Sequence, residues 1–145
     1  MEKSKLVGSS LPEFTFRVEK GKIREMALAI GDGKKIYTGT EEAKELGHRD
    51  VIAPPTFGLC IDLWGGPDFM EICRWLGLNP VKVLHGEQEF EYLGDICAGD
   101  EITVSTSLAG YTEKKSMHIF SIDSAYTAAG RGPVLKSRKT IIELQ

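Results

Sequence analysis

Carboxylates, phenols and imidazoles are the side chains of this sequence that could carry acid–base chemistry. Asp32 and Tyr37 lie close together in the first third of the chain, and three histidines, His48, His85 and His118, are spread along the rest. Proton transfer needs an acid and a base within hydrogen-bond reach of one substrate. Asp32 also suits a solvated turn after Gly31, and Tyr37 also suits a packed aromatic ring. Spacing alone therefore leaves a catalytic and a structural role open for each.

The cysteines indicate neither metal nor disulfide chemistry. Cys60, Cys73 and Cys97 are odd in number, widely spaced and form no Cys-x-x-Cys pair, so neither a zinc site nor a disulfide framework is indicated. We expect them to be small buried hydrophobic residues. The sequence also has no metal-ligand cluster and no glycine-rich phosphate loop, so we expect no metal and no cofactor.

Length and charge narrow the class of protein. The chain has 145 residues, and its 18 Lys+Arg against 21 Asp+Glu give a formal net charge of −3. We expect one domain over residues 1–145 and no electrostatic surface for nucleic acid. No apolar run is long enough for a membrane helix, and the basic segment 1–5 is not followed by the apolar core of a secretory signal. The expected compartment is therefore the cytoplasm.

Periodicity in the first part of the sequence predicts one strand and two helices. Apolar and polar residues alternate over 11–18, which predicts a half-buried strand. Apolar residues at i, i+3, i+4 and i+7 predict an amphipathic helix over 22–30. A short helix is expected over 40–47, with Thr40 as its N-cap and Gly47 at its end.

The most apolar part of the chain follows two adjacent prolines, Pro54 and Pro55. Prolines are tolerated where a helix begins, because the first backbone N–H groups have no intrahelical partner. The Gly-Gly-Pro at 65–67 divides this part into two predicted helices, 55–63 and 68–76. Asp62 is the one charged residue of the first helix, and we expect it to face solvent at the helix end.

After residue 80 the hydrophobic period changes to two, which predicts strands. Their predicted ranges are 81–92, 101–108, 117–128 and 134–144, with turns at 94–100 and 110–115. On the first of them, residues 81, 83, 85, 87 and 89 are expected to share one face. These elements predict an α+β fold, with a long antiparallel sheet wrapped around a central apolar helix.

Three segments in this order resemble the MaoC-like dehydratases, in particular the N-terminal type of MaoC domain. They are AIGDGKKIYTGTEEAKELGHRDVIAPPTF (29–57), VLHGEQEFEY (83–92) and AGDEITV (98–104), and the likeness covers about residues 6–144. The resemblance implies a hot-dog fold and the hydration or dehydration of acyl thioesters on CoA or acyl carrier protein. It also implies a homodimer or higher oligomer, or a heterodimer with a catalytically complete MaoC-like subunit.

The family's catalytic motif, Asp-x-Asn-Pro-x-His, is only half present. By this resemblance Asp32 matches the motif's aspartate, whereas Tyr37 stands where complete members have histidine. A phenol titrates near pH ~10 and imidazole near ~6.5, so tyrosine is a poor proton carrier at neutral pH. The His-Gly-Met stretch that supplies an oxyanion donor is replaced here by Pro54, Pro55 and Thr56, and proline has no N–H.

The resemblance therefore implies a partner subunit, or a weakly active form, of a 3-hydroxyacyl-thioester dehydratase or (R)-specific enoyl hydratase. Asp32 and Tyr37 are the candidate catalytic residues. The implied substrate-binding residues are Pro55, Thr56, Phe57, His85 and Gly86. Two alternatives remain open: a non-catalytic acyl-CoA binding module, and a hot-dog thioesterase that uses Asp32 or Asp62 as a base.

Overall fold

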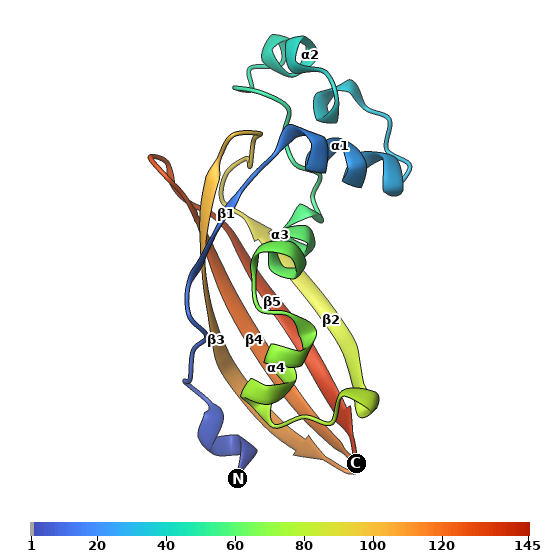
Figure 1. Cartoon of the computed structure of the whole chain (residues 1–145), viewed down its shortest axis with the longest axis vertical. Helices are drawn as coiled ribbons and strands as arrows, with labels where there is room; N and C mark the ends of the chain where they lie inside the picture. The colour runs from blue at the N-terminus through green and yellow to red at the C-terminus, as the bar shows by residue number, and fades with distance from the viewer. Residues whose placement is uncertain (1) are drawn as a thin grey trace.

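A computed structural model describes residues 2–145; Met1, the first residue of segment 1–5 and of the predicted domain, lies outside the described residues. Five antiparallel strands form a sheet in the order β1-β3-β4-β5-β2 (Figure 1). In chain order they are β1 (Phe14–Arg17), β2 (Val83–Tyr92), β3 (Glu101–Lys114), β4 (Met117–Ala128) and β5 (Gly132–Leu144). The strands predicted from the period of two are confirmed.

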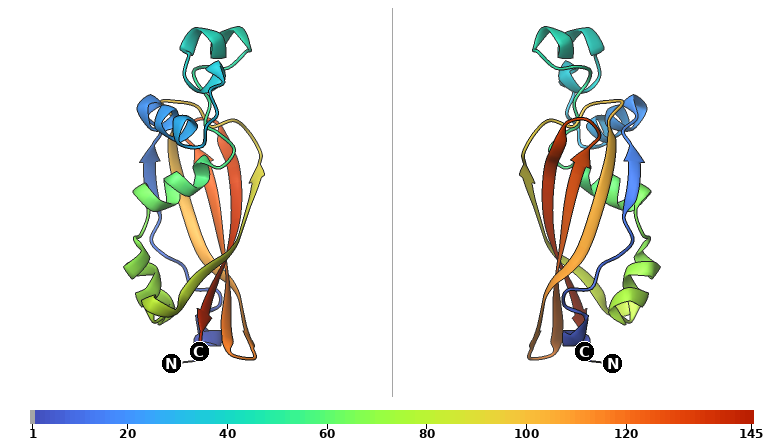
Figure 2. Two further views of the ribbon diagram at one scale, coloured as in Figure 1. Left: turned by 90° about the vertical axis from the view of Figure 1, so that its right-hand side faces the viewer. Right: turned by 90° about the vertical axis from the view of Figure 1, so that its left-hand side faces the viewer.

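The helices lie on one face and at one end of this sheet. They are α1 (Lys20–Ala29), α2 (Thr40–Glu45), α3 (Phe57–Gly65) and α4 (Phe69–Leu76), with short 3-10 turns at Lys3–Leu6, Lys35–Tyr37 and Pro80–Lys82. Helices α3 and α4 follow the length of the sheet, whereas α1 lies beside its upper end and α2 beyond that end, opposite both chain termini (Figures 1 and 2). None of the helices between residues 2 and 145 is long and apolar enough to cross a membrane.

Helix α3 places one side against the sheet. Phe57, Gly58, Ile61 and Asp62 are buried, which is the i, i+1, i+4, i+5 stripe of a helix that lies on a surface. The approach is close, because a Cβ atom on Gly58 would lie 2.6 Å from the Phe90 ring. The other side, with Leu63 and Trp64, is 63% and 53% exposed, so the sheet covers α3 from one side.

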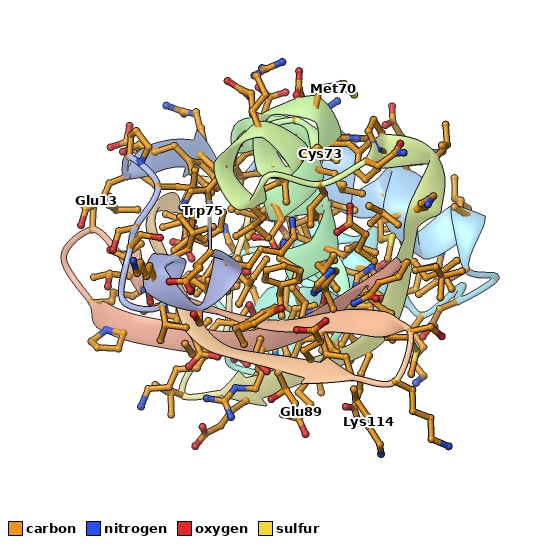
Figure 3. The ribbon with its side chains drawn as sticks, turned by 90° about the horizontal axis from the view of Figure 1, so that it is seen from below. Glu13, Met70, Cys73, Trp75, Glu89 and Lys114 are labelled. Carbon is orange, nitrogen blue, oxygen red and sulfur yellow. The ribbon has the colours of Figure 1, made fainter. Side chains whose placement is uncertain are left out.

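Helix α4 has well-defined ends. The Asp68 carboxylate accepts a hydrogen bond from the Glu71 backbone N–H, and the Glu71 carboxylate accepts one from the Asp68 N–H, which completes a capping box. Gly77 ends the helix with a φ of 64°. Seen from below, Met70 and Cys73 of α4 lie on one side of the sheet and Glu89 on the other (Figure 3). Cys73 contributes to the core below α4.

Two local predictions are wrong. The turn predicted over 110–115 is strand, because β3 pairs with β4 as far as Lys114↔Met117. Thr40 does not cap α2: Gly39 is the N-cap, and the Thr40 hydroxyl instead accepts from Lys20 and donates to Asp50.

A bulge in β2 changes which side chains face the helices. His85 is paired with Ile141, but the next pair is Glu87↔Thr140, so Gly86 is the extra residue. Because one extra residue reverses the alternation, His85 lies on the same face as the buried Ile141, whereas Glu87 lies on the opposite face. The prediction that residues 81, 83, 85, 87 and 89 share one face is therefore wrong beyond His85, and Val81 lies in the turn Pro80–Lys82 before the strand.

Candidate functional site

Two neighbouring tyrosines, Tyr37 and Tyr92, lie near the N-terminal end of α3. The Tyr37 side chain is buried in the main core. The Tyr92 hydroxyl donates hydrogen bonds to the carbonyl oxygens of Pro54 and Pro55, at 3.3 and 2.8 Å. Burial, with a smaller effect of the neighbouring Tyr37 phenol, raises the pKa of Tyr92 to about 12. The Tyr92 phenol therefore keeps its proton at neutral pH.

Asp32 lies in the turn after α1. Its Oδ1 accepts a hydrogen bond of 3.2 Å from the Lys34 backbone N–H, and its Oδ2 lies 3.8 Å from the Lys34 ammonium. The side chain is 27% exposed. No hydrogen bond joins Asp32 to Tyr37 among the contacts of residues 2–145, so the structure does not bring the two into a direct acid–base pair.

The residues that the resemblance assigns to substrate binding divide into two places. Pro55 and Thr56 are exposed where α3 begins, while the Phe57 ring is fully buried and meets Phe16 edge to face with centroids 6.3 Å apart. His85 and Gly86 lie on β2 instead, at the bulge. His85 faces a pocket under the C-terminal half of α3.

The prediction for Asp62 is wrong: its side chain is buried and points to the sheet, not to solvent. The Tyr126 hydroxyl, which is also 3.0 Å from the Ser137 Oγ, donates a 2.6 Å hydrogen bond to Oδ1 of Asp62. The Lys139 ammonium lies 3.4 Å from Oδ2. Burial raises the pKa of Asp62, and the charge of Lys139 opposes that rise. The error arises because the predicted helix over 55–63 is apolar on nearly every side. Its hydrophobic pattern therefore does not indicate which side, and which residues with it, faces the sheet.

The pocket beside Asp62 has a volume of about 170 Å³. Its walls come from α3, α4 and the facing sides of β2, β4 and β5. Most of the lining is apolar, and the polar residues are Asp62, His85 and Lys139, hereafter the polar corner. Sequence reasoning missed Lys139, although the alternation of β5 places it on the same face as the buried Leu135, Ser137 and Ile141.

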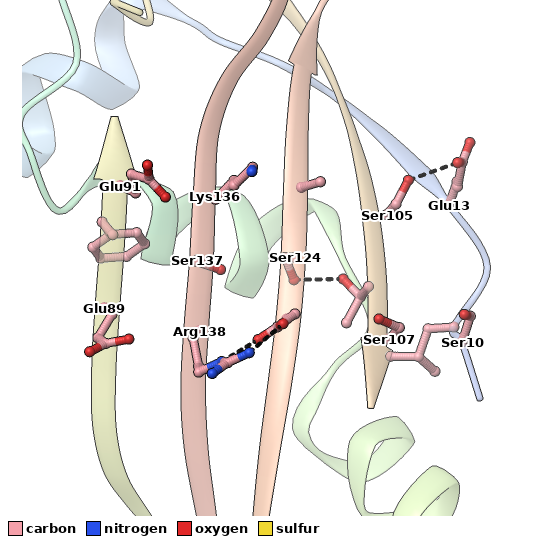
Figure 4. A pocket seen from close by; sticks show the side chains of 15 residues that line it. Ser10, Glu13, Glu89, Glu91, Ser105, Ser107, Ser124, Lys136, Ser137 and Arg138 are labelled. Atoms are coloured by element: carbon pink, nitrogen blue, oxygen red, sulfur yellow. Dashed lines mark hydrogen bonds and ion pairs between the residues drawn. The ribbon is translucent and has the colours of Figure 1, made fainter. Parts of the chain in front are cut away.

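A larger hollow, of about 900 Å³, lies on the outer face of the sheet. Figure 4 shows it with α3 behind the strands. Arg138 binds both carboxylate oxygens of Asp123, at 2.7 and 2.8 Å, and Glu13 accepts a hydrogen bond from Ser105. Glu89, Glu91 and Lys136 are its remaining charged side chains, and no ion pair of the described residues joins them.

The other two histidines have local partners. Nδ1 of His48 lies 2.9 Å from the Asp95 carboxylate, and Nδ1 of His118 lies 2.6 Å from the Tyr111 hydroxyl. Because its imidazole contacts Asp95, His48 does not take the place of the motif histidine, which is Tyr37 in this chain. Within the described chain, Cys60, Cys73 and Cys97 are free thiols, and no group of His, Cys, Asp and Glu side chains could hold a metal ion.

The loops around α1 and α2 are tied to the sheet by Asp100. This buried carboxylate accepts hydrogen bonds from the guanidinium groups of Arg49 and Arg131 and from the Cys97 backbone N–H. Arg49 follows α2, and Arg131 lies in the turn between β4 and β5. Asp100 therefore fixes the segment between α2 and α3 relative to the strands.

Comparisons of the sequence and of the structure with known proteins both find dehydratase domains. Residues 5–136 match the family model described as FAS1-like, dehydratase domain region. A UPF0336 protein of Streptomyces coelicolor is 44% identical over 104 residues, which are 71% of this chain and 69% of that protein. The crystal structure of a truncated HadBC (3R-hydroxyacyl-ACP dehydratase) complex from Mycobacterium tuberculosis matches with a TM-score of 0.81 at 18% identity, over 97% of this chain and 99% of that one.

A solved MaoC-like dehydratase also matches with a TM-score of 0.81, at 21% identity. The match takes in 99% of this chain but only 44% of the other. These structural likenesses confirm the predicted hot-dog fold.

Proposed function

Because this chain belongs to the MaoC-like hot-dog dehydratase family, and matches its FAS1-like dehydratase domain region, we propose that it is the partner subunit of a two-chain acyl-thioester dehydratase or hydratase. The reaction adds water across the C2–C3 double bond of an enoyl thioester, with hydroxide to C3 and a proton to C2, or runs in reverse. In this assignment the complete acid–base pair comes from a second chain.

The observation that carries the proposal is the burial of Tyr37, which is 7% exposed within the core. The resemblance places Tyr37 where complete members have histidine. Because the Tyr37 side chain is packed in the core, it is badly placed to pass a proton between solvent and a substrate. Asp32 is half-buried and contacts Lys34, and among residues 2–145 no histidine or tyrosine side chain makes a hydrogen bond or ion pair with it.

The absence of an N–H on Pro54 and Pro55 supports the same assignment. An oxyanion donor is worth about 10²–10³ in rate, and neither proline can act as one, because proline has no backbone N–H. The proline substitution thus removes a donor at the start of α3, and a second subunit would have to supply its equivalent.

Two further features favour a second hot-dog domain beside this one. The MaoC-like dehydratase chain is about twice the matched length, and HadBC is named as a complex. In addition, β2 is an edge strand whose one strand neighbour in this chain is β5. An exposed edge of 10 residues offers its unpaired backbone groups to another chain.

The test is the hydration of crotonyl-CoA, followed by the loss of enoyl absorbance. The purified chain is assayed alone and with the product of a neighbouring gene that encodes a MaoC-like chain with both motif residues. We expect negligible turnover alone and a clear rate in the mixture. No turnover in either sample would remove the enzymatic role.

A non-catalytic acyl-thioester binding module is the second candidate, and the burial of Tyr37 favours it as well. Calorimetry with acyl-CoA would then show saturable binding, while mass spectrometry shows the ligand unchanged. Release of free thiol from acyl-CoA would instead indicate a thioesterase. The structure does not favour this third function, because both carboxylate oxygens of Asp62 already accept hydrogen bonds.

A further inference from the structure

Strand β2 forms one end of the sheet, and among residues 2–145 no strand pairs with its free edge. Beyond the bulge at Gly86 the strand is regular, because every residue from Glu87 to Tyr92 is paired in register with β5. The strand at the other end of the sheet, β1, has only 4 residues. An unpaired edge can accept a strand of another chain, and β2 offers the longer edge for this.

Three carboxylates follow one another along the outer face of this regular segment. Glu87, Glu89 and Glu91 are exposed and alternate with Gln88 and Phe90, which face the helices. Figure 4 shows Glu89 and Glu91 on β2, with α3 behind the strands. The three glutamates are hereafter the acidic edge. Neighbours among them are two residues apart, about 7 Å along the strand, so they form one row of negative charge.

The neighbouring strand β5 offsets only part of this charge. Arg138 lies opposite Glu89 in the register, but its guanidinium binds both carboxylate oxygens of Asp123, at 2.7 and 2.8 Å. Lys136 lies opposite Glu91, and it makes no ion pair with any residue that the structure describes. Even when the charge of Lys136 is counted against Glu91, the row keeps a net negative charge beside unpaired backbone groups.

The acidic edge opposes pairing with a second copy of this chain. Two copies that pair antiparallel through β2 are related by a two-fold axis through the sheet, and directly opposite residues then point to the same face. With the axis at Glu89, this residue meets its own counterpart, and Glu87 meets Glu91. Moving the axis by one residue places Glu89 opposite Glu87 or Glu91 instead. Because like charges directly opposite each other are destabilising, each of these registers carries repulsion.

The helix side of the same edge carries exposed apolar side chains. Leu63 of α3 and Phe69 of α4 are 63% and 50% exposed, and they line one pocket together with Val83 of β2. Burial of such surface favours association with a partner of any charge. Complementary charge mainly decides which partner binds. The β2 edge therefore combines an apolar surface that favours association with a row of charges that selects the partner.

We propose that β2 pairs antiparallel with the edge strand of a chain of different sequence, which carries Lys or Arg at the outward positions opposite Glu87, Glu89 and Glu91. The same carboxylates disfavour a second copy in that place. The inference deepens the proposed function and rests on it, because it states what the partner subunit presents to this chain. Opposite charges at cross-strand positions stabilise such a pair, whereas like charges destabilise it.

A charge-swapped copy of this chain tests the pairing without the natural partner. The basic-edge variant carries Glu87→Lys, Glu89→Lys and Glu91→Lys together. Sedimentation equilibrium and native mass spectrometry compare each full chain alone with an equal mixture of the two. We expect a mixed dimer whose dissociation constant is at least about tenfold lower than that of either chain with itself, because three pairs change from like to opposite charge. No mixed dimer, or equal dissociation constants for mixed and like pairs, would overturn the proposal.

Salt dependence shows whether charge is the cause of the selection. The Debye length is about 30 Å at about 10 mM ionic strength and about 3 Å at about 1 M. Added sodium chloride should therefore weaken the mixed dimer and strengthen the association of the wild type with itself. A change of the same sign in both would contradict the role given to the acidic edge.

A neutral variant covers the case in which the basic-edge variant does not fold. Glu87→Gln, Glu89→Gln and Glu91→Gln together keep the exposed side chains polar and remove their repulsion. This variant should associate with itself at least about tenfold more tightly than the wild type does. Self-association equal to that of the wild type would show that the carboxylates do not oppose pairing.

The matched control places the same change of charge on other elements. Glu25→Lys in α1, with Glu41→Lys and Glu45→Lys in α2, replaces three exposed glutamates away from β2. We expect no mixed dimer of this variant with the wild type. A mixed dimer as tight as that of the basic-edge variant would show that net charge alone drives association, and would overturn the assignment to β2.

The natural partner is tested with the second MaoC-like chain of the two-chain assay. The wild type should bind it at least about tenfold more tightly than the basic-edge variant does, and equal binding would overturn the inference. A mixed dimer, together with no turnover in the two-chain assay, would retain the role of β2 and remove the dehydratase assignment. Turnover that the basic-edge variant supports as well as the wild type does would have the reverse meaning, so the two claims fail separately.

Discussion

The hydroxyl of Tyr126 on β4 donates a 2.6 Å hydrogen bond to the carboxylate of Asp62 on α3, with both side chains buried between the helix and the sheet. It joins α3 to the sheet together with the 3.4 Å contact from Lys139 on β5 to the other oxygen of the same carboxylate. It fixes the rotation of α3 on the sheet, because only one face of the helix can present Asp62 to Tyr126.

Tyr126→Phe removes this donor and leaves one carboxylate oxygen of Asp62 unpaired. We expect a loss of about 2 kcal/mol in the free energy of unfolding, measured by urea denaturation. Tyr111→Phe is the control, because the Tyr111 hydroxyl bonds His118 in a partly exposed place; its cost should be under about 1 kcal/mol. Equal losses in the two variants would show that the hydrogen bond to Asp62 contributes no more to stability than the partly exposed bond to His118.

The raised pKa of Asp62 makes the free energy of unfolding depend on pH. Burial favours the protonated form in the folded protein, so the contribution of this group is fully present below the ordinary aspartate pKa. It is lost as pH rises from about 4 through the raised, folded-state pKa. Asp62→Asn cannot ionise, and its stability relative to the wild type should therefore increase over that range.

That difference is measured by urea denaturation of both proteins from pH 4 to pH 8. Other titrating groups cancel in the comparison, because the two chains differ at residue 62 alone. If the relative stability of Asp62→Asn instead falls as pH rises, the carboxylate is stabilised in its ionised form and the assigned direction is wrong.

The elements of this fold were predictable where several local signals agreed. The helix over 68–76 begins at a capping aspartate and ends at a glycine, and α4 follows both signals. The strand over 117–128 has the bounds of β4. Strong alternation and clear caps act within one element, so they can be read without knowing what that element packs against.

The errors concern relations between elements, which local patterns do not encode. The bulge at Gly86 depends on the pairing of β2 with β5, and it separates the faces of His85 and Glu87. Asp62 is buried because Tyr126 and Lys139, at least 64 residues further along the chain, supply its partners. The family resemblance indicated the fold, the candidate pair Asp32 and Tyr37, and His85, but it did not indicate that Asp62 and Lys139 lie in one pocket with His85.

The capping box of α4 makes a prediction that concerns the edge of the pocket. Asp68→Ala removes the acceptor for the Glu71 backbone N–H and should cost about 1 kcal/mol of stability. Asp68→Asn keeps a capping oxygen and should cost at most a few tenths of that amount. Thermal denaturation followed by circular dichroism distinguishes them, and equal midpoints would contradict the role of the cap.

The closeness of α3 to the sheet is tested at Gly58. Alanine there would bring Cβ to 2.6 Å from the Phe90 ring and 2.9 Å from Leu135, and such overpacking costs about 1–3 kcal/mol. Gly21→Ala, in α1, meets nothing within 4 Å and should instead stabilise by about 0.5 kcal/mol, because alanine is the better helix former. The two substitutions thus have opposite expected signs in one urea-denaturation experiment. A stabilising Gly58→Ala would show that α3 lies further from β2 and β5.

The central claim is that this chain contributes a hot-dog subunit without a complete acid–base pair. The most direct test titrates it into a fixed amount of a MaoC-like chain that carries both motif residues, with crotonyl-CoA hydration as the readout. The account predicts negligible activity for this chain alone and a rate that rises and then saturates at one chain per partner. Full activity of this chain alone would contradict it.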